Sequence, residues 1–163
     1  MTHQTARLIL AMAIVLMAGA AQAADFKTYP GAMCQPGELT NASNIEYRFT
    51  GEVFNTSTEF SVLVVCPIVR DSVFTPPGDL RAVFVRFSKP NDIPATCTLF
   101  SRDQFGTSGF MDTRFTSGVG NVVMGFPALS GVHIGYYVLS CIVPHAQDDR
   151  PSGIVSYLVV EGE

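Results

Sequence analysis

Apolar and polar residues alternate with a period of two through most of this chain, and this pattern limits its fold more than any other feature. The clearest case is segment 45–53, IEYRFTGEV, in which every even position is polar. No stretch after Ala24 repeats apolar residues at helical spacing over three turns. Successive side chains of a strand point to opposite faces of a sheet, so the pattern predicts an all-β chain with half-buried strands.

Strand patterns of this kind recur at short intervals along the chain. They cover residues 45–53, 60–66, 83–87, 95–100, 122–129, 134–143 and 154–160. We expect the first two strands to form one hairpin and the next two a second, with Pro67 ending the strand before it. The densely apolar segment 134–143 should lie at the centre of a sheet. About eight strands at this spacing predict a two-sheet antiparallel β-sandwich with two disulfides.

The N-terminal segment differs from the rest of the chain. Arg7 precedes an apolar run from Leu8 to Ala21, and the sequence Ala21-Gln22-Ala23 supplies a small-x-small cleavage signal. The apolar run is shorter than the roughly 20 residues that a membrane-spanning helix needs. We therefore interpret residues 1–23 as a signal peptide and 24–163 as one β-sandwich domain. This predicts export to the periplasm or the extracellular space without a permanent membrane anchor.

Four cysteines lie after the apolar run: Cys34, Cys66, Cys97 and Cys141. None belongs to a closely spaced pair, so two disulfides are a better interpretation than a zinc site. Three pairings are possible, and we favour Cys34–Cys66 with Cys97–Cys141, since the last two occupy inward positions of strand patterns. We expect Cys97–Cys141 to lie deeper in the core, and its loss to cost more stability.

Composition excludes some classes of protein. Only 15% of the residues are charged and 47% are hydrophobic, which is typical of a chain that buries a core. The net charge of −4 offers no cationic surface for a phosphate backbone, so nucleic-acid binding is not expected.

Catalytic signals are sparse, and we assign no catalytic or cofactor-binding residue. In the polar turn 145–153, His145 stands three residues before Asp148, which is followed by Asp149. An imidazole and two carboxylates can share a metal ion, so these three residues are the candidate metal ligands, although one turn alone makes a weak site. The strained G-x-S-x-G turn of serine hydrolases is absent from the sequence.

Segment 101–121 is rich in Gly, Ser and Thr and carries Phe105, Phe110 and Phe115 at intervals of five. It is either a loose hairpin or a long functional loop. The three rings either anchor that hairpin in the core, which we favour, or form an exposed surface for a protein or glycan.

Several segments resemble uncharacterised small exported bacterial proteins with four cysteines. The most specific are Cys66-Pro67-Ile68-Val69-Arg70-Asp71 and Ser156-Tyr157-Leu158-Val159-Val160-Glu161. The resemblance implies fold and compartment and carries no activity. We therefore expect an exported, non-enzymatic binding or envelope-associated module whose end loops, 70–80, 101–121 and 145–153, contact a protein or glycan. The alternative is a small secreted hydrolase or metal-dependent enzyme that uses the turn 145–153.

Overall fold

The structure is a computed structural model that describes residues 24–38, 40–70, 80–107, 109–129 and 135–162. The predicted signal peptide and most of loop 70–80 lie outside these residues. The described part of the chain is a two-layer antiparallel β-sandwich with two short 3₁₀ turns, Gly31–Met33 and Ala42–Asn44. The predicted fold class is confirmed. No helix of the described residues is long and apolar enough to cross a membrane.

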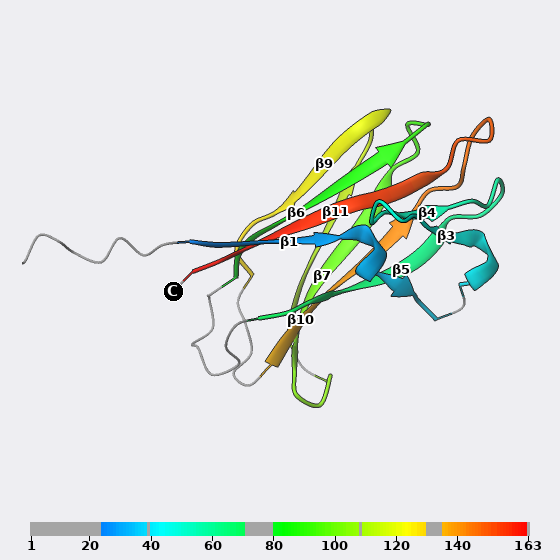
Figure 1. Cartoon of the computed structure of the whole chain (residues 1–163). Coiled ribbons are helices and arrows are strands. Elements are labelled where there is room, and N and C mark those ends of the chain that lie inside the picture. Colours follow the sequence, from blue (N-terminus) through cyan, green and yellow to red (C-terminus); the bar gives the residue numbers. More distant parts are fainter. Residues whose placement is uncertain (1–23, 39, 71–79, 108, 130–134, 163) are drawn as a thin grey trace, which may run out of the picture.

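Two sheets make up the sandwich, and Figure 1 shows β9, β6 and β11 in one layer with β5, β10 and β7 in the other. Sheet A contains β1 (Asp25–Pro30), β3 (Ile45–Tyr47), β4 (Val53–Asn55), β6 (Leu80–Lys89), β9 (Gly120–Phe126) and β11 (Ser152–Glu161). Sheet B contains β2 (Gln35–Pro36), β5 (Val62–Ile68), β7 (Ala95–Asp103), β8 (Gly109–Thr116) and β10 (Gly135–Val143). The order in sheet B is β2-β5-β10-β7-β8, so β10 lies at its centre, as predicted.

The core lies between the sheets and follows the alternation of the sequence. Val83, Val85 and Phe87 of β6 are fully buried, and they belong to the same core cluster as the inward residues Leu139 and Cys141 of β10. Their neighbours in sequence point outward to water. Burial of this apolar surface is the main contribution to the stability of the fold.

A buried tyrosine joins the two sheets. The Tyr157 hydroxyl on β11 donates a hydrogen bond of 2.6 Å to the carbonyl oxygen of Pro67 on β5. Its ring stacks on that of Tyr29 with 5.0 Å between the centroids. Burial, and to a lesser extent Tyr29, raise the pKa of Tyr157 above its ordinary value. The hydroxyl therefore keeps its proton and remains a donor.

Neither of the two predicted hairpins forms, and the first of their predicted strands is itself two strands. Segment 45–53 is not one strand, because the chain reverses at Gly51, whose φ of +97° suits glycine, and β3 pairs with β4. The turns after β4 and β6 then lead into the other sheet, so β4 does not pair with β5, nor β6 with β7. Turn residues mark where a strand ends, but they do not determine which sheet the next strand joins.

Pro67 does not end β5, which continues to Ile68. The N–H and C=O of Leu63 both bond to the Thr40 hydroxyl, so they point away from β10. Backbone groups of a strand alternate in direction, so the nitrogen of Pro67, four residues later, also points away from β10. On that side β2 pairs only with Val64 and Val65. The missing N–H of Pro67 therefore removes no ladder bond.

Both disulfides have the predicted pairing, Cys34–Cys66 and Cys97–Cys141. Cys97 and Cys141 are directly opposite residues of β7 and β10, and Cys34 lies just before β2, opposite β5. The expected difference in depth is wrong, because all four cysteines are fully buried. Both bridges lie within sheet B and face the core.

Equal burial predicts similar losses of stability from the two bridges. Replacing Cys34 and Cys66 by Ala, or Cys97 and Cys141 by Ala, should each lower the free energy of unfolding by about 3 kcal/mol. The sequence separations of 32 and 44 residues change the loop entropy by only about 0.3 kcal/mol. Urea unfolding of the two double variants measures both losses. A gap of more than about 2 kcal/mol between them would contradict the argument.

Candidate functional site

A groove of about 230 Å³ crosses the outer face of sheet A. Its lining comes from outward positions of four neighbouring strands, β1, β11, β6 and β9: Thr28, Phe84, Arg86, Val123, Ser156 and Leu158. The strand register brings them together, since Leu158 lies opposite both Thr28 and Phe84, and Arg86 lies opposite both Ser156 and Val123. The site therefore rests on paired strands and not on a loop.

Phe84 forms the aromatic wall of this groove. Its neighbour across the ladder is Gly125, where an added Cβ would lie 3.3 Å from Cε1 of the Phe84 ring. The ring thus packs over β9 at a position without a side chain. It remains 41% exposed, so part of its surface is open to a ligand.

The polar groups of the groove have no partner in the part of the chain that the structure describes. Among the described residues, no hydrogen bond or ion pair includes the exposed Arg86 guanidinium or the hydroxyls of Thr28 and Ser156. The guanidinium offers donors only, while each hydroxyl donates and accepts. The groove therefore combines an exposed ring and aliphatic side chains with free hydrogen-bonding groups.

A second pocket, of about 190 Å³, lies at the end of the sandwich where β3 and β4 meet the turn 145–153. Two of its polar side chains are paired with each other: Arg48 Nε donates to Glu46 Oε1 at 2.9 Å, and the guanidinium carbon lies 4.1 Å from the centroid of the Phe54 ring. Its lining has no aromatic residue, so this end pocket is a weaker candidate than the groove for a ligand with an apolar face.

The three candidate metal ligands do not converge. Asp149 lines the end pocket, whereas the exposed Asp148 lies 3.9 Å from Arg150 in a surface ion pair. The backbone carbonyl of half-buried His145 accepts hydrogen bonds from the side chains of Asn91 and Ser152. In the part of the chain that the structure describes, no group of three or more His, Cys, Asp or Glu side chains is placed to hold a metal. A metal-dependent enzyme at this turn stays a prediction.

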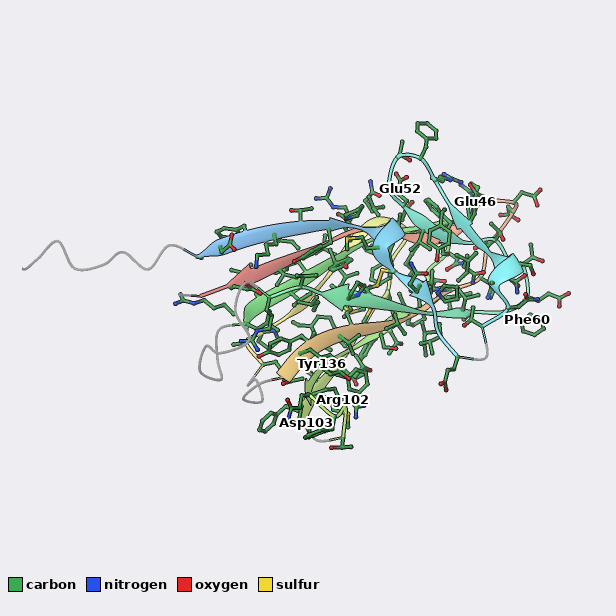
Figure 2. The ribbon with its side chains drawn as sticks, turned by 60° about the horizontal axis from the view of Figure 1, so that its bottom comes forward. Glu46, Glu52, Phe60, Arg102, Asp103 and Tyr136 are labelled. Atoms are coloured by element: carbon green, nitrogen blue, oxygen red, sulfur yellow. A yellow bond between two sulfur atoms is a disulfide. The ribbon has the colours of Figure 1, made fainter. Side chains whose placement is uncertain are left out.

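The three phenylalanines of segment 101–121 do not anchor a core. Residues 101–103 and 109–116 form the β7–β8 hairpin, so the loose-hairpin interpretation holds for this part of the segment. Phe105 lies in the hairpin turn and is 77% exposed. Phe110 and Phe115 are 53% and 77% exposed, because β8 is an edge strand whose two faces both meet water. At the tip of the hairpin, Arg102 and Asp103 lie beside Tyr136, away from Glu46 and Glu52 (Figure 2).

A buried lysine lies at the end of β6. Lys89 Nζ donates to the carbonyl oxygen of Thr116 at 3.3 Å, which links sheet A to the end of β8. Burial lowers the pKa of Lys89, and the charge of Asp92 partly opposes this shift. The contact is structural and lies outside the groove.

Asn55 holds the end of the sandwich together. Its side-chain nitrogen lies 2.8, 3.1 and 3.0 Å from the carbonyl oxygens of Phe60, Val143 and Pro144. Its Oδ1 accepts the N–H of Ser57 at 2.9 Å. One amide thus connects the end of β4 in sheet A to the end of β10 in sheet B.

We expect Asn55→Asp to destabilise the protein more than Asn55→Ala at neutral pH. Alanine leaves buried polar groups unpaired, at a cost of about 1–3 kcal/mol. A carboxylate in the same place cannot donate to three carbonyl oxygens and is a buried unpaired charge, which costs about 3–5 kcal/mol. Burial raises the folded pKa of such a carboxyl above its unfolded value, so its penalty is present at high pH and is lost as pH falls through the folded value.

Thermal unfolding of both variants between pH 4 and 8 measures this effect. Asn121→Asp on the exposed surface of β9 is the matched control, and its stability should differ little from that of the unchanged protein. Equal loss for Asn55→Asp at pH 4 and pH 8 would contradict the role of the amide as a donor.

The sequence contains one signal for the groove that the alternation alone did not reveal. Phe84 occupies an outward position of β6, between the inward Val83 and Val85. A single exposed ring is common, and it becomes a signal only when apolar neighbours such as Leu158 and Val123 join it on one face. Its partners, Thr28 and Val123, are distant in sequence, so no local motif could connect them.

The sequence matches no protein-family model and no curated protein. Its fold is similar to that of several solved structures. The xylan-binding module CBM86 of Roseburia intestinalis has a TM-score of 0.51 and 11% identity over 85% of this chain and 96% of its own. The CBM36-1 domain of a xylanase from the hindgut metagenome of Trinervitermes trinervoides has a TM-score of 0.50 and 15% identity, covering 85% and 98%.

A family two carbohydrate esterase from Cellvibrio japonicus has a TM-score of 0.50 and 6% identity over 86% of this chain. This chain spans only 35% of that enzyme. At such low identity the likeness shows a shared β-sandwich fold.

Proposed function

We propose that this protein is an exported, non-enzymatic module that binds carbohydrate in the groove of sheet A. The observation that carries the proposal is an open groove in which an exposed aromatic ring lies beside polar groups without partners in the described residues. The two disulfides support an oxidising compartment outside the cytoplasm.

The chemistry of the groove matches that of a sugar chain. A sugar ring has apolar faces made of C–H groups and a polar edge made of hydroxyls. The apolar face fits against Phe84 and Leu158, and the hydroxyls fit the guanidinium of Arg86 and the free hydroxyls of Thr28 and Ser156.

The same residues support binding without turnover. The lining of the groove contains no histidine, carboxylate or thiol. A glycoside or ester hydrolase needs a general acid, a general base or a nucleophile next to the bond that it cleaves. The hydroxyls of Thr28 and Ser156 are the only potential nucleophiles among the six lining residues, and the lining supplies no base to activate either of them.

Two of the similar folds belong to a xylan-binding module and to a domain of a xylanase, so xylan is the first polysaccharide to test. Identity of 11–15% carries no ligand specificity by itself. Arg86 favours an acidic polysaccharide, because a single guanidinium can pair with the occasional carboxylates along such a chain. Glucuronoxylan should therefore bind more tightly than unsubstituted xylan.

We expect Phe84→Ala and Arg86→Ala each to weaken polysaccharide binding about tenfold, since each removes a contact worth roughly 1.4 kcal/mol. Calorimetry and affinity electrophoresis with xylan, glucuronoxylan, laminarin and cellulose measure the change. The Arg86 variant should also lose the preference for glucuronoxylan.

Two substitutions outside the groove are matched controls. Phe49→Ala removes a ring that is 103% exposed at the β3–β4 turn, and Arg150→Ala removes an exposed guanidinium. Both should bind within twofold of the unchanged protein. If none of the four polysaccharides binds, or if the controls weaken binding as much as the groove variants, the proposal is wrong.

A further inference from the structure

β8 is an open edge of sheet B. It pairs with β7 along one side, and among the described strands none pairs with its other side. Soluble proteins protect exposed edges with proline, with charged residues such as lysine, or with a covering segment. β8, GFMDTRFT, has no proline or lysine, and its two charged residues, Asp112 and Arg114, form an ion pair with each other. It exposes Phe110, Met111 and Phe115 by 53%, 70% and 77%. Such an edge is suited to pair with another strand.

The Cys97–Cys141 pair determines which backbone groups of β8 face outward. The Cα atoms of these directly opposite residues are 4.0 Å apart, which identifies the narrow, non-hydrogen-bonded type of antiparallel pair. The N–H and C=O of Cys97 therefore point toward β8, where they meet Arg114. Because direction alternates along a strand, Met111, Thr113 and Phe115 present their N–H and C=O groups to the open edge.

The side chains of β8 are complementary to those of a second, antiparallel copy. Arg114 Nε lies 2.9 Å from Asp112 Oδ2 in the same strand. If Thr113 lies opposite Thr113 of the second copy, Asp112 lies opposite Arg114, and Met111 opposite Phe115. Each carboxylate then contacts two guanidinium groups, and both apolar side chains gain a neighbour on the same face.

Charge excludes the neighbouring registers. Residues directly opposite in a sheet share a face, so the register can shift only by two residues. A shift in one direction places Asp112 opposite Asp112, and a shift in the other places Arg114 opposite Arg114. Like charges directly opposite each other destabilise a strand pair. The register centred on Thr113 is therefore favoured over both.

We infer that this protein forms a symmetric dimer in which β8 pairs antiparallel with β8 of a second copy, with the two-fold axis at Thr113. The interface is isologous, since each copy offers the same strand. The hydrogen-bonded pairs are Met111 with Phe115, Thr113 with Thr113, and Phe115 with Met111. Sheet B becomes one continuous sheet across both copies.

Sedimentation velocity of the purified protein over a range of concentrations measures the dimer. Asp112→Arg places Arg against Arg114 of the second copy and should weaken dimerisation at least tenfold. The charge-exchanged variant Asp112→Arg/Arg114→Asp restores opposite charges in the same register, so it should dimerise within about threefold of the unchanged protein. Glu46→Arg on β3 makes the same change of charge next to another arginine, Arg48, and should have no effect on dimerisation.

A crosslinking experiment tests the register separately. Thr113→Cys lies on the two-fold axis and should form a disulfide-linked dimer under mild oxidation, whereas Met111→Cys, opposite Phe115, should not.

Three results would overturn the inference. They are a protein that stays monomeric at several hundred micromolar, a dimer that Asp112→Arg does not weaken, and a charge-exchanged variant that fails to dimerise while folded by circular dichroism. A monomer that binds an added strand peptide at β8 would assign the edge to a foreign protein instead. None of these results depends on carbohydrate binding.

Discussion

The direct opposition of Cys97 and Cys141 fixes the register of β7 against β10, the central strand of sheet B. Because side chains alternate with a period of two, a shift of one residue would turn every inward side chain of these strands outward. The same register determines the direction of each backbone N–H across the sheet. It accounts for the presence of Pro67 inside β5, and it leaves the unpaired donors of β8 on the open edge.

The fold class could be predicted because its signal is local. Val83, Val85 and Phe87 alternate with outward residues in the sequence and are buried in the structure. The same alternation placed Cys97 and Cys141 on inward faces, and their pairing is confirmed. Cys34 lies in a segment without a strand pattern, so its full burial could not be predicted. It is buried because the two-residue strand β2 continues sheet B beyond β5.

The path of the chain between the sheets could not be predicted, because contacts distant in sequence determine it. The Asn55 amide bonds to the carbonyls of Val143 and Pro144, which lie 88 and 89 residues away. In the sequence Asn55 resembles any turn asparagine. The groove of sheet A is equally non-local, since Thr28, Phe84 and Val123 meet only through strand pairing. In the turn 145–153, Asp149 and Pro151 help to line the end pocket together with Glu46 and Arg48. Glu46 and Arg48 belong to the β3–β4 hairpin, which the sequence pattern predicted as one strand.

The groove and the open edge lie on different sheets, and this separation determines how they would work together. A two-fold axis that extends sheet B is perpendicular to that sheet, so both copies of sheet A lie on the same side of it. The outer faces of sheet A, with the two grooves, then face in the same direction. A dimer of this kind would present both proposed carbohydrate sites to one polysaccharide surface. The second contact forms at an effective concentration set by the rigid sheet, so two weak sites would bind an insoluble glycan far more tightly than either alone.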